Sequence, residues 1–275
     1  MALLNVRGLM LLWKRIGEDD VMGLAAQLAY FFLLSLFPLL IFLVTLLPYL
    51  PITQDEMLSV VADFAPGETM TFIETNLNEI MNQQNRTLLS FGIIATMWSA
   101  SNGINAIIRA LNKAYDVKEN RSFVVARGMA IIFTVAMIFV FIIALLLPVF
   151  GKQIGMFLFA KLGFSSHFLS FWHMLRWILS FLIIFIVFLV LYWLAPNKRF
   201  QCIDAVPGAI FATVSWLIVS WGFSFYVSNF GNYSATYGSI GAVIVLLIWF
   251  YLTGIIIIIG GEVNALNQFL KDETC

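Results

Sequence analysis

The feature that most constrains this chain is a run of 23 residues without a single ionisable side chain. It covers residues 128–150 and reads GMAIIFTVAMIFVFIIALLLPVF. About 20 apolar residues in a helix cross the hydrocarbon core of a bilayer, so a run of this length indicates a membrane span. The whole chain has the same character, with 61% hydrophobic and 11% charged residues, whereas soluble domains carry about 25% charged residues. The sequence therefore predicts an integral membrane protein.

Five further apolar runs are long enough to cross a bilayer as helices. The first contains Pro38, which a membrane helix tolerates where neighbouring groups satisfy the freed carbonyl. We expect an all-α fold in which residues 1–275 form a single polytopic membrane domain. The six predicted spans are residues 23–50, 88–111, 128–150, 177–195, 205–230 and 238–261.

The distribution of lysine and arginine predicts the orientation. Basic residues near the ends of spans favour the cytoplasmic side. Eleven of the fifteen basic residues belong to the N-terminus, the second and fourth loops or the C-terminus. Both termini are therefore predicted to be cytoplasmic.

Two segments outside the spans have apolar residues at helical spacing. Residues 1–20 are predicted to form an amphipathic helix on the inner leaflet, its cations near anionic headgroups, and residues 17–20 (GEDD) to break it and cap the first span. Simple extension of the first span is the alternative. Residues 51–87 are predicted to form short helices in the first extracytoplasmic loop, either capping a cavity or packing on the outer surface.

The sequence carries no recognised catalytic motif. His167 and His173 have no carboxylate nearby in the sequence, and Cys202 and Cys275 lack metal-ligand spacing. Phosphate-binding loops, dinucleotide fingerprints and nucleophile elbows are also missing. We therefore expect no catalytic residue, no metal site, no cofactor and no enzymatic activity.

Polar residues inside the second predicted span form one stripe. Trp98, Asn102, Asn105, Arg109 and Asn112 recur at spacings of four, three, four and three, which places them on one helical face. Lipid would penalise that face, so it should look into the helix bundle or into a water-filled cavity. Helix packing and a functional cavity are both open readings of this stripe.

An acid near the end of the chain suggests a partner for this stripe. Glu262 follows five isoleucines and two glycines, and it lies 21 residues after Gly241, near the outer start of its span, or about 31 Å inward. Arg109 lies at a similar depth in the second span. We hypothesise that Glu262 binds Arg109 and that Gln27, Asn105 or Asn264 completes the hydrogen bonds. Such a pair could be a structural clasp or a gate.

Other candidate residues of the cavity lie on the first span. Gln27 and Tyr30 stand close to its cytoplasmic end, with Pro38 further in. Small residues on the last span have a simpler interpretation, because they let membrane helices approach closely. The residues predicted to serve helix packing or hinges are Gly238, Gly241, Gly254 and Gly261.

Three motifs resemble the YihY/BrkB family of bacterial inner-membrane proteins. They are LAAQLAYFFLLSLFPLL, WSASNGINAIIRALNKAY and YGSIGAVIVLLIWFYLTGIIIIIGGEVNAL. The resemblance implies a six-span protein of the bacterial cytoplasmic membrane with cytoplasmic ends. An older family label, the tRNA-processing ribonuclease BN, does not fit this sequence, which has no soluble basic face and no metal-ligand set. Within these motifs stand Gln27, Tyr30, Pro38, Trp98, Asn102, Arg109, Gly238, Gly241, Glu262 and Asn264.

Two functions of different classes follow. The first is a transporter or permease for a lipid, an amphiphile or a small osmolyte, with a polar cavity between spans one, two, five and six. The second is a non-transporting scaffold or partner of envelope and lipid-homeostasis machinery. Membrane lipids are the expected partners, with a homo-oligomer or an envelope protein as further candidates, and no nucleic acid is expected.

Overall fold

The computed structural model describes residues 6–49, 85–138, 166–198, 201–230 and 239–272, and the single positions 58, 74, 77 and 81. Its regular elements are helices, and no strand occurs among the described residues. An apolar helix, Phe123–Ile138, lies between the labelled helices α5 and α7. The labelled elements are α1 (Val6–Glu18), α2 (Val21–Leu46), η2 (Leu47–Tyr49), α5 (Arg86–Ala114), α7 (Ser166–Leu194), η3 (Cys202–Ala205), α8 (Val206–Phe230) and α10 (Ser239–Asp272).

Four stretches of helix are long and apolar enough to cross a membrane. Val21–Tyr49, Arg86–Ala114, Cys202–Val227 and Ile240–Lys271 coincide with predicted spans one, two, five and six. Shorter apolar helices, Phe123–Ile138 and Ile178–Leu194, stand where spans three and four are predicted. The all-α prediction is confirmed for the described residues. The count of six and the cytoplasmic termini remain predictions.

The chain turns between α1 and α2 at the acidic residues of the GEDD segment. Asp20 has a φ of 53°, a left-handed conformation that Asp adopts more readily than bulky residues. Its side chain accepts a hydrogen bond of 3.3 Å from the backbone N–H of Gly23 and so caps the start of α2. The short helices predicted within residues 51–87 lie outside the described residues, apart from the four single positions.

The chain divides into two compact units, and residues 32–100 form the smaller one. The part of α2 in this unit continues through Pro38 without a break. A glycine of α5 brings the two helices together: a Cβ added at Gly92 would lie 3.1 Å from the Cα of Phe42. Small residues permit this kind of backbone approach between membrane helices.

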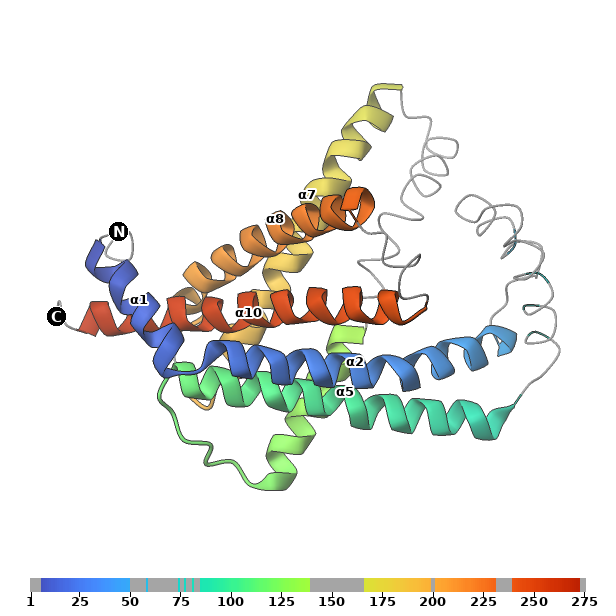
Figure 1. The fold of residues 1–275 in the computed structure, drawn as a ribbon, viewed down its shortest axis with the longest axis horizontal. Coiled ribbons are helices and arrows are strands. Elements are labelled where there is room, and N and C mark those ends of the chain that lie inside the picture. The colour runs from blue at the N-terminus through green and yellow to red at the C-terminus, as the bar shows by residue number, and fades with distance from the viewer. Residues whose placement is uncertain are drawn as a thin grey trace. The chain divides into compact units, whose positions relative to one another are not determined.

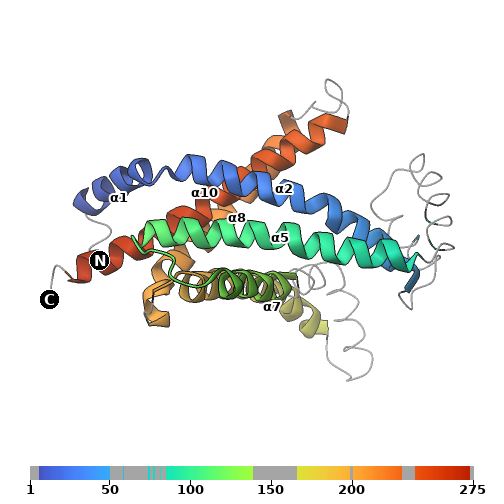
Figure 2. The ribbon, with the colours of Figure 1, turned by 90° about the horizontal axis from the view of Figure 1, so that it is seen from below.

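The larger unit contains residues 1–31 and 101–275, and α10 is its central helix. It packs most extensively on α8, and it also contacts α1 and η3. In Figures 1 and 2, α10 crosses α8, and α1 lies beside the C-terminal half of α10. Helix α7 packs on α8 and also contacts η3.

Three glycines of α10 stand at its close contacts. A Cβ at Gly254 would lie 3.1 Å from the carbonyl oxygen of Ala25 in α2. A Cβ at Gly260 would overlap the hydroxyl of Tyr192 in α7, and one at Gly261 would overlap the side chain of Leu111 in α5. Each glycine therefore lies against a different neighbouring helix. Gly241 is also buried, while Gly238 lies outside the described residues.

Candidate functional site

A buried carboxylate on α10 forms the centre of the site. Glu262 is 0% exposed, and its Oε2 accepts a hydrogen bond of 2.8 Å from Nε of Arg15 at the end of α1. The same guanidinium donates to the backbone carbonyl of Ala114, the last residue of α5. Arg15 thus links α1, α5 and α10. We call Arg15, Tyr115, Glu262 and Asn264 the Glu262 cluster.

The second oxygen of this carboxylate is placed differently. Oε1 of Glu262 is buried and accepts no hydrogen bond from the described residues. The acidic side chain of Asp19, just after α1, is close enough to interact electrostatically with Glu262. The backbone oxygen of Asp19 also accepts a hydrogen bond of 2.5 Å from the ammonium of Lys113 in α5. Glu262 therefore has a second acid nearby as well as its partner Arg15.

The predicted partner of Glu262 was wrong. Arg109 is exposed on α5, and no ion pair or hydrogen bond joins it to another described residue. The depth estimate placed both residues near the same end of their helices but could not say which face of α5 looks toward α10. Arg15 was missed because α1 was expected to lie on the leaflet. One signal was available: Arg15 is the last basic residue before the GEDD turn, so it lies near the same end of the helices as Glu262.

Asn264, two residues further along α10, caps the start of α8. Its Oδ1 accepts a hydrogen bond of 2.6 Å from the N–H of Gly208, and its Nδ2 donates to the carbonyl of Ala205 at 3.2 Å. The first N–H groups of a helix have no partner within that helix, so a side chain from another helix replaces the usual cap. Helices α8 and α10 approach closely here, since a Cβ added at Gly208 would overlap the carbonyl oxygen of Gly260.

Two buried tyrosines complete the surroundings of α10. The hydroxyl of Tyr192 in α7 donates a hydrogen bond of 2.8 Å to the carbonyl of Ile257. Tyr115 follows α5 directly, and burial raises the pKa of its hydroxyl above the usual range, although Asn264 acts in the opposite direction. The Tyr115 hydroxyl therefore remains protonated at neutral pH and can act as a hydrogen-bond donor.

Residues of the polar stripe predicted on α5 form hydrogen bonds with several different neighbours. Oδ1 of Asn102 accepts a hydrogen bond of 2.7 Å from Arg127, which stands in the following apolar helix. Asn112 donates to Glu119 at 2.9 Å and accepts from the N–H of Asn197 at 2.7 Å. Both asparagines therefore connect α5 to other parts of the larger unit.

The remaining candidate residues stand on α2 and α5. Gln27 and Tyr30 are exposed on α2, and Trp98 is 63% exposed on α5. Asn105 is partly exposed, and Pro38 lies within α2 in the smaller unit. Whether these residues border a cavity remains a prediction.

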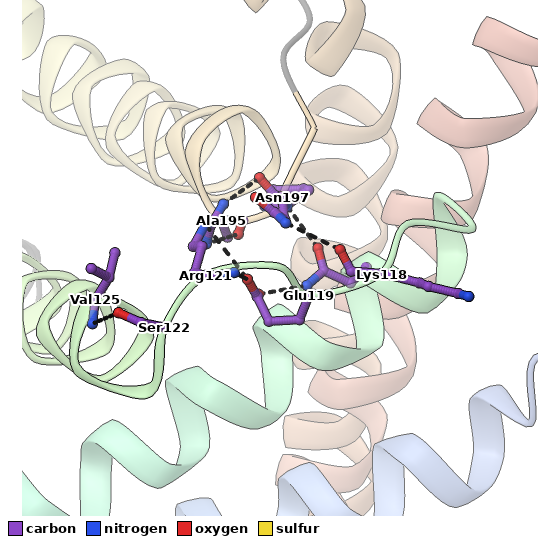
Figure 3. A network of polar contacts seen from close by, with 9 residues as sticks. Lys118, Glu119, Arg121, Ser122, Val125, Ala195 and Asn197 are labelled. Carbon is purple, nitrogen blue, oxygen red and sulfur yellow. Dashed lines mark hydrogen bonds and ion pairs between the residues drawn. The ribbon is translucent and has the colours of Figure 1, made fainter.

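A second network lies where the loop after α5 meets the end of α7 (Figure 3). Arg121 donates hydrogen bonds to the carbonyls of Ala195 at 3.2 Å and Pro196 at 2.8 Å. The carboxylate of Glu119 accepts from the N–H of Arg121 at 3.0 Å and lies 3.8 Å from its Nε. A cation at the last carbonyls of a helix is favoured by the helix dipole. Apart from the basic loop, no sequence signal predicted this network.

No group of three or more His, Cys, Asp and Glu side chains that could hold a metal ion occurs among the residues that the structure describes. Several apolar helices joined by buried polar contacts, with an acid held inside one of them, define a helical multi-pass membrane protein. The sequence comparisons agree with this class.

The chain belongs to the virulence factor BrkB family, whose model matches residues 12–273. It is 57% identical to the putative ribonuclease-like protein YfkH of Bacillus subtilis over 95% of this chain and 96% of that protein. It is also 31% identical to a UPF0761 membrane protein of Vibrio parahaemolyticus, over 92% of this chain and 80% of the relative. No solved structure matches the chain.

Proposed function

We propose that this protein is a membrane permease for a lipid, an amphiphile or a small osmolyte, closed at one end by the ion pair between Arg15 and Glu262. The observation that carries the proposal is the fully buried Glu262 carboxylate inside an apolar helix, 2.8 Å from Arg15. Ionisable residues within membrane spans are costly, and they commonly mark transport pathways.

The position of Arg15 supports a movable closure. It stands on α1, a helix of 13 residues that precedes the first candidate span and has a turn of its own before α2. When α1 shifts, Arg15 leaves both Glu262 and the carbonyl of Ala114. The inner ends of α5 and α10 then lose the residue that joins them.

The unpaired oxygen of Glu262 supplies a means of opening. Protonation of this carboxylate, or binding of a cationic group to Oε1, weakens its attraction for Arg15. A substrate or proton therefore competes directly with the residue that closes the protein.

The test is transport by the full chain reconstituted into liposomes. One arm follows a fluorescent phospholipid between leaflets, and the other follows release of a radiolabelled zwitterionic osmolyte, each with and without a pH gradient. We expect one cargo to move faster than in protein-free vesicles, and Glu262→Gln to change that rate at least several-fold. Gly222→Ala is the matched control, since an added Cβ there meets nothing within 4 Å.

A scaffold is the second candidate function, and a specific observation favours it. The amides of Asn102 and Asn112 are engaged by Arg127, Glu119 and Asn197 within the chain, as expected if the polar stripe joins helices. If both cargoes cross at the protein-free rate under every gradient, the permease proposal fails and the scaffold is preferred.

A further inference from the structure

The strongest feature without an assigned role is an open depression beside the network of Figure 3. It has a volume of about 580 Å³ and is lined by none of the residues used in the permease proposal. Its lining combines cations, amides and apolar side chains: Asn120, Arg121, Trp193, Leu194, Pro196, Asn197 and Lys198.

The first cation of the depression is held in a defined position. Arg121 uses one N–H of each terminal nitrogen to bind the carbonyls of Ala195 and Pro196, and its Nε faces Glu119 at 3.8 Å. An arginine side chain has five N–H donors, so each terminal nitrogen retains one more. The guanidinium is therefore preorganised and still able to donate to an anion.

The second cation is exposed. Nζ of Lys198 lies 5.9 Å from the centre of the Tyr115 ring, and no carboxylate among the described residues forms an ion pair with it. The described lining of the depression thus includes the two cations Arg121 and Lys198, and Glu119 pairs with the first of them. The amides of Asn120 and Asn197 add polar groups beside these cations.

The apolar part of the lining continues along a predicted span. Trp193 and Leu194 are 39% and 42% exposed at the end of α7, and Val190 and Ile186 are exposed further along the same helix. Tryptophan is enriched where a span meets the headgroup region. The charged part of the depression therefore lies at the level of headgroups, and its apolar part extends toward the acyl chains.

We propose that this depression binds an anionic membrane lipid, with its phosphate at Arg121 and Lys198 and its acyl chains along the exposed side of α7. Basic pockets beside span ends recognise anionic headgroups in this way. Trp193 and Leu194 favour a lipid over a soluble phosphate, because a soluble anion would leave their exposed surface unused. This site does not depend on the permease function.

The test is native mass spectrometry of the full chain in detergent micelles titrated with dioleoyl phosphatidylglycerol or dioleoyl phosphatidylcholine. We expect the wild type to retain phosphatidylglycerol preferentially, Lys198→Gln to bind it about fivefold more weakly, and Lys198→Arg to bind it as the wild type does. Lys118→Gln is the matched control: it removes the same charge from the same region, but Lys118 does not line the depression and points away from Arg121 in Figure 3.

Three results would overturn the proposal. Equal binding of the two lipids by the wild type would remove the headgroup preference, whatever the variants do. Equal weakening by Lys198→Gln and Lys118→Gln would reduce the effect to general surface charge. Displacement of phosphatidylglycerol by stoichiometric inorganic phosphate or glycerol phosphate would identify the site as one for a soluble anion.

Discussion

The two halves of α10 differ in how they are packed, although both are strongly apolar. In the first half Ile240 is 65% exposed, and Val243 and Ile248 are also exposed. From Gly254 to Leu266 nearly every residue is buried, and Ile258 and Glu262 are 0% exposed. Hydrophobicity therefore does not decide which half forms the core of this unit.

The difference follows from small and polar residues. Lipid tails are as apolar as isoleucine, so apolar side chains alone do not drive membrane helices together. The buried half has glycines that admit neighbouring helices, and Glu262 and Asn264 bind groups on α1, η3 and α8. The described polar contacts of the exposed half are long ones, 3.4 Å from Trp249 to the hydroxyl of Ser220 in α8 and 3.4 Å from Tyr251 to the sulfur of Met22 in α2. Four predictions test this explanation.

Removal of the cation should have the largest effect. Arg15→Gln leaves the Glu262 carboxylate buried without its partner, which costs about 3–5 kcal/mol when such a pair is fully buried, and Arg15 is 26% exposed. We expect a loss toward the lower end of that range, measured as the unfolding free energy in detergent. Glu262→Gln added to Arg15→Gln should restore much of it, because no buried charge then remains.

Arg109→Gln is the control for this prediction. Arg109 is exposed and has no described ion pair, so its loss should leave the unfolding free energy within about 0.5 kcal/mol. A larger loss from Arg109→Gln than from Arg15→Gln would restore the pairing expected from the sequence alone.

The same substitution in each half of α10 compares them directly. Ile258→Ala should cost about 2–4 kcal/mol, because it opens a cavity among buried side chains. Ile240→Ala should cost less than about 0.5 kcal/mol in lipid, because its side chain is mostly exposed. Thermal unfolding of both variants in nanodiscs measures this. Equal losses would mean that the two halves are packed alike.

A methyl group at the helix crossing tests the role of close approach. Gly208→Ala places a Cβ against the carbonyl of Gly260, and overpacking of this kind costs about 1–3 kcal/mol. Gly222→Ala, on the same helix with nothing within 4 Å, should be neutral or slightly stabilising. Chemical denaturation compares the two, and similar midpoints would exclude a tight crossing at Gly208.

The smallest of the four losses is expected from the interhelical cap. Asn264→Ala removes the acceptor for the N–H of Gly208 and the donor to Ala205, and unsatisfied buried groups cost about 1–2 kcal/mol. Hydrogen exchange at the start of α8 should rise in this variant. Unchanged exchange there would show that Asn264 does not cap α8.

Much of the fold was predictable because a bilayer imposes simple rules on a sequence. The apolar runs located the helices, and the GEDD segment located the turn that separates α1 from α2. The small residues of the last span, Gly254 and Gly261, stand at contacts with Ala25 and Leu111. Each of these features depends on residues adjacent in the sequence.

The partners of the polar residues were less predictable. Depth along a span can be estimated from residue counts, but the rotation of one helix against another depends on packing from all sides. This is why the sequence could point to Glu262 as a candidate, whereas Arg109 was wrongly chosen as its partner in place of Arg15.

By itself, the sequence determined the membrane class and the helices, because composition and apolar runs suffice for these, and its motifs determined the family. Only the tertiary structure decided that Arg15 meets Glu262, that Asn264 caps another helix and that Arg121 lies beside Lys198. Arg15 and Glu262 are 247 positions apart in the sequence, and Gly208 and Asn264 are 56 positions apart. Only the folded arrangement of the helices brings such distant residues together.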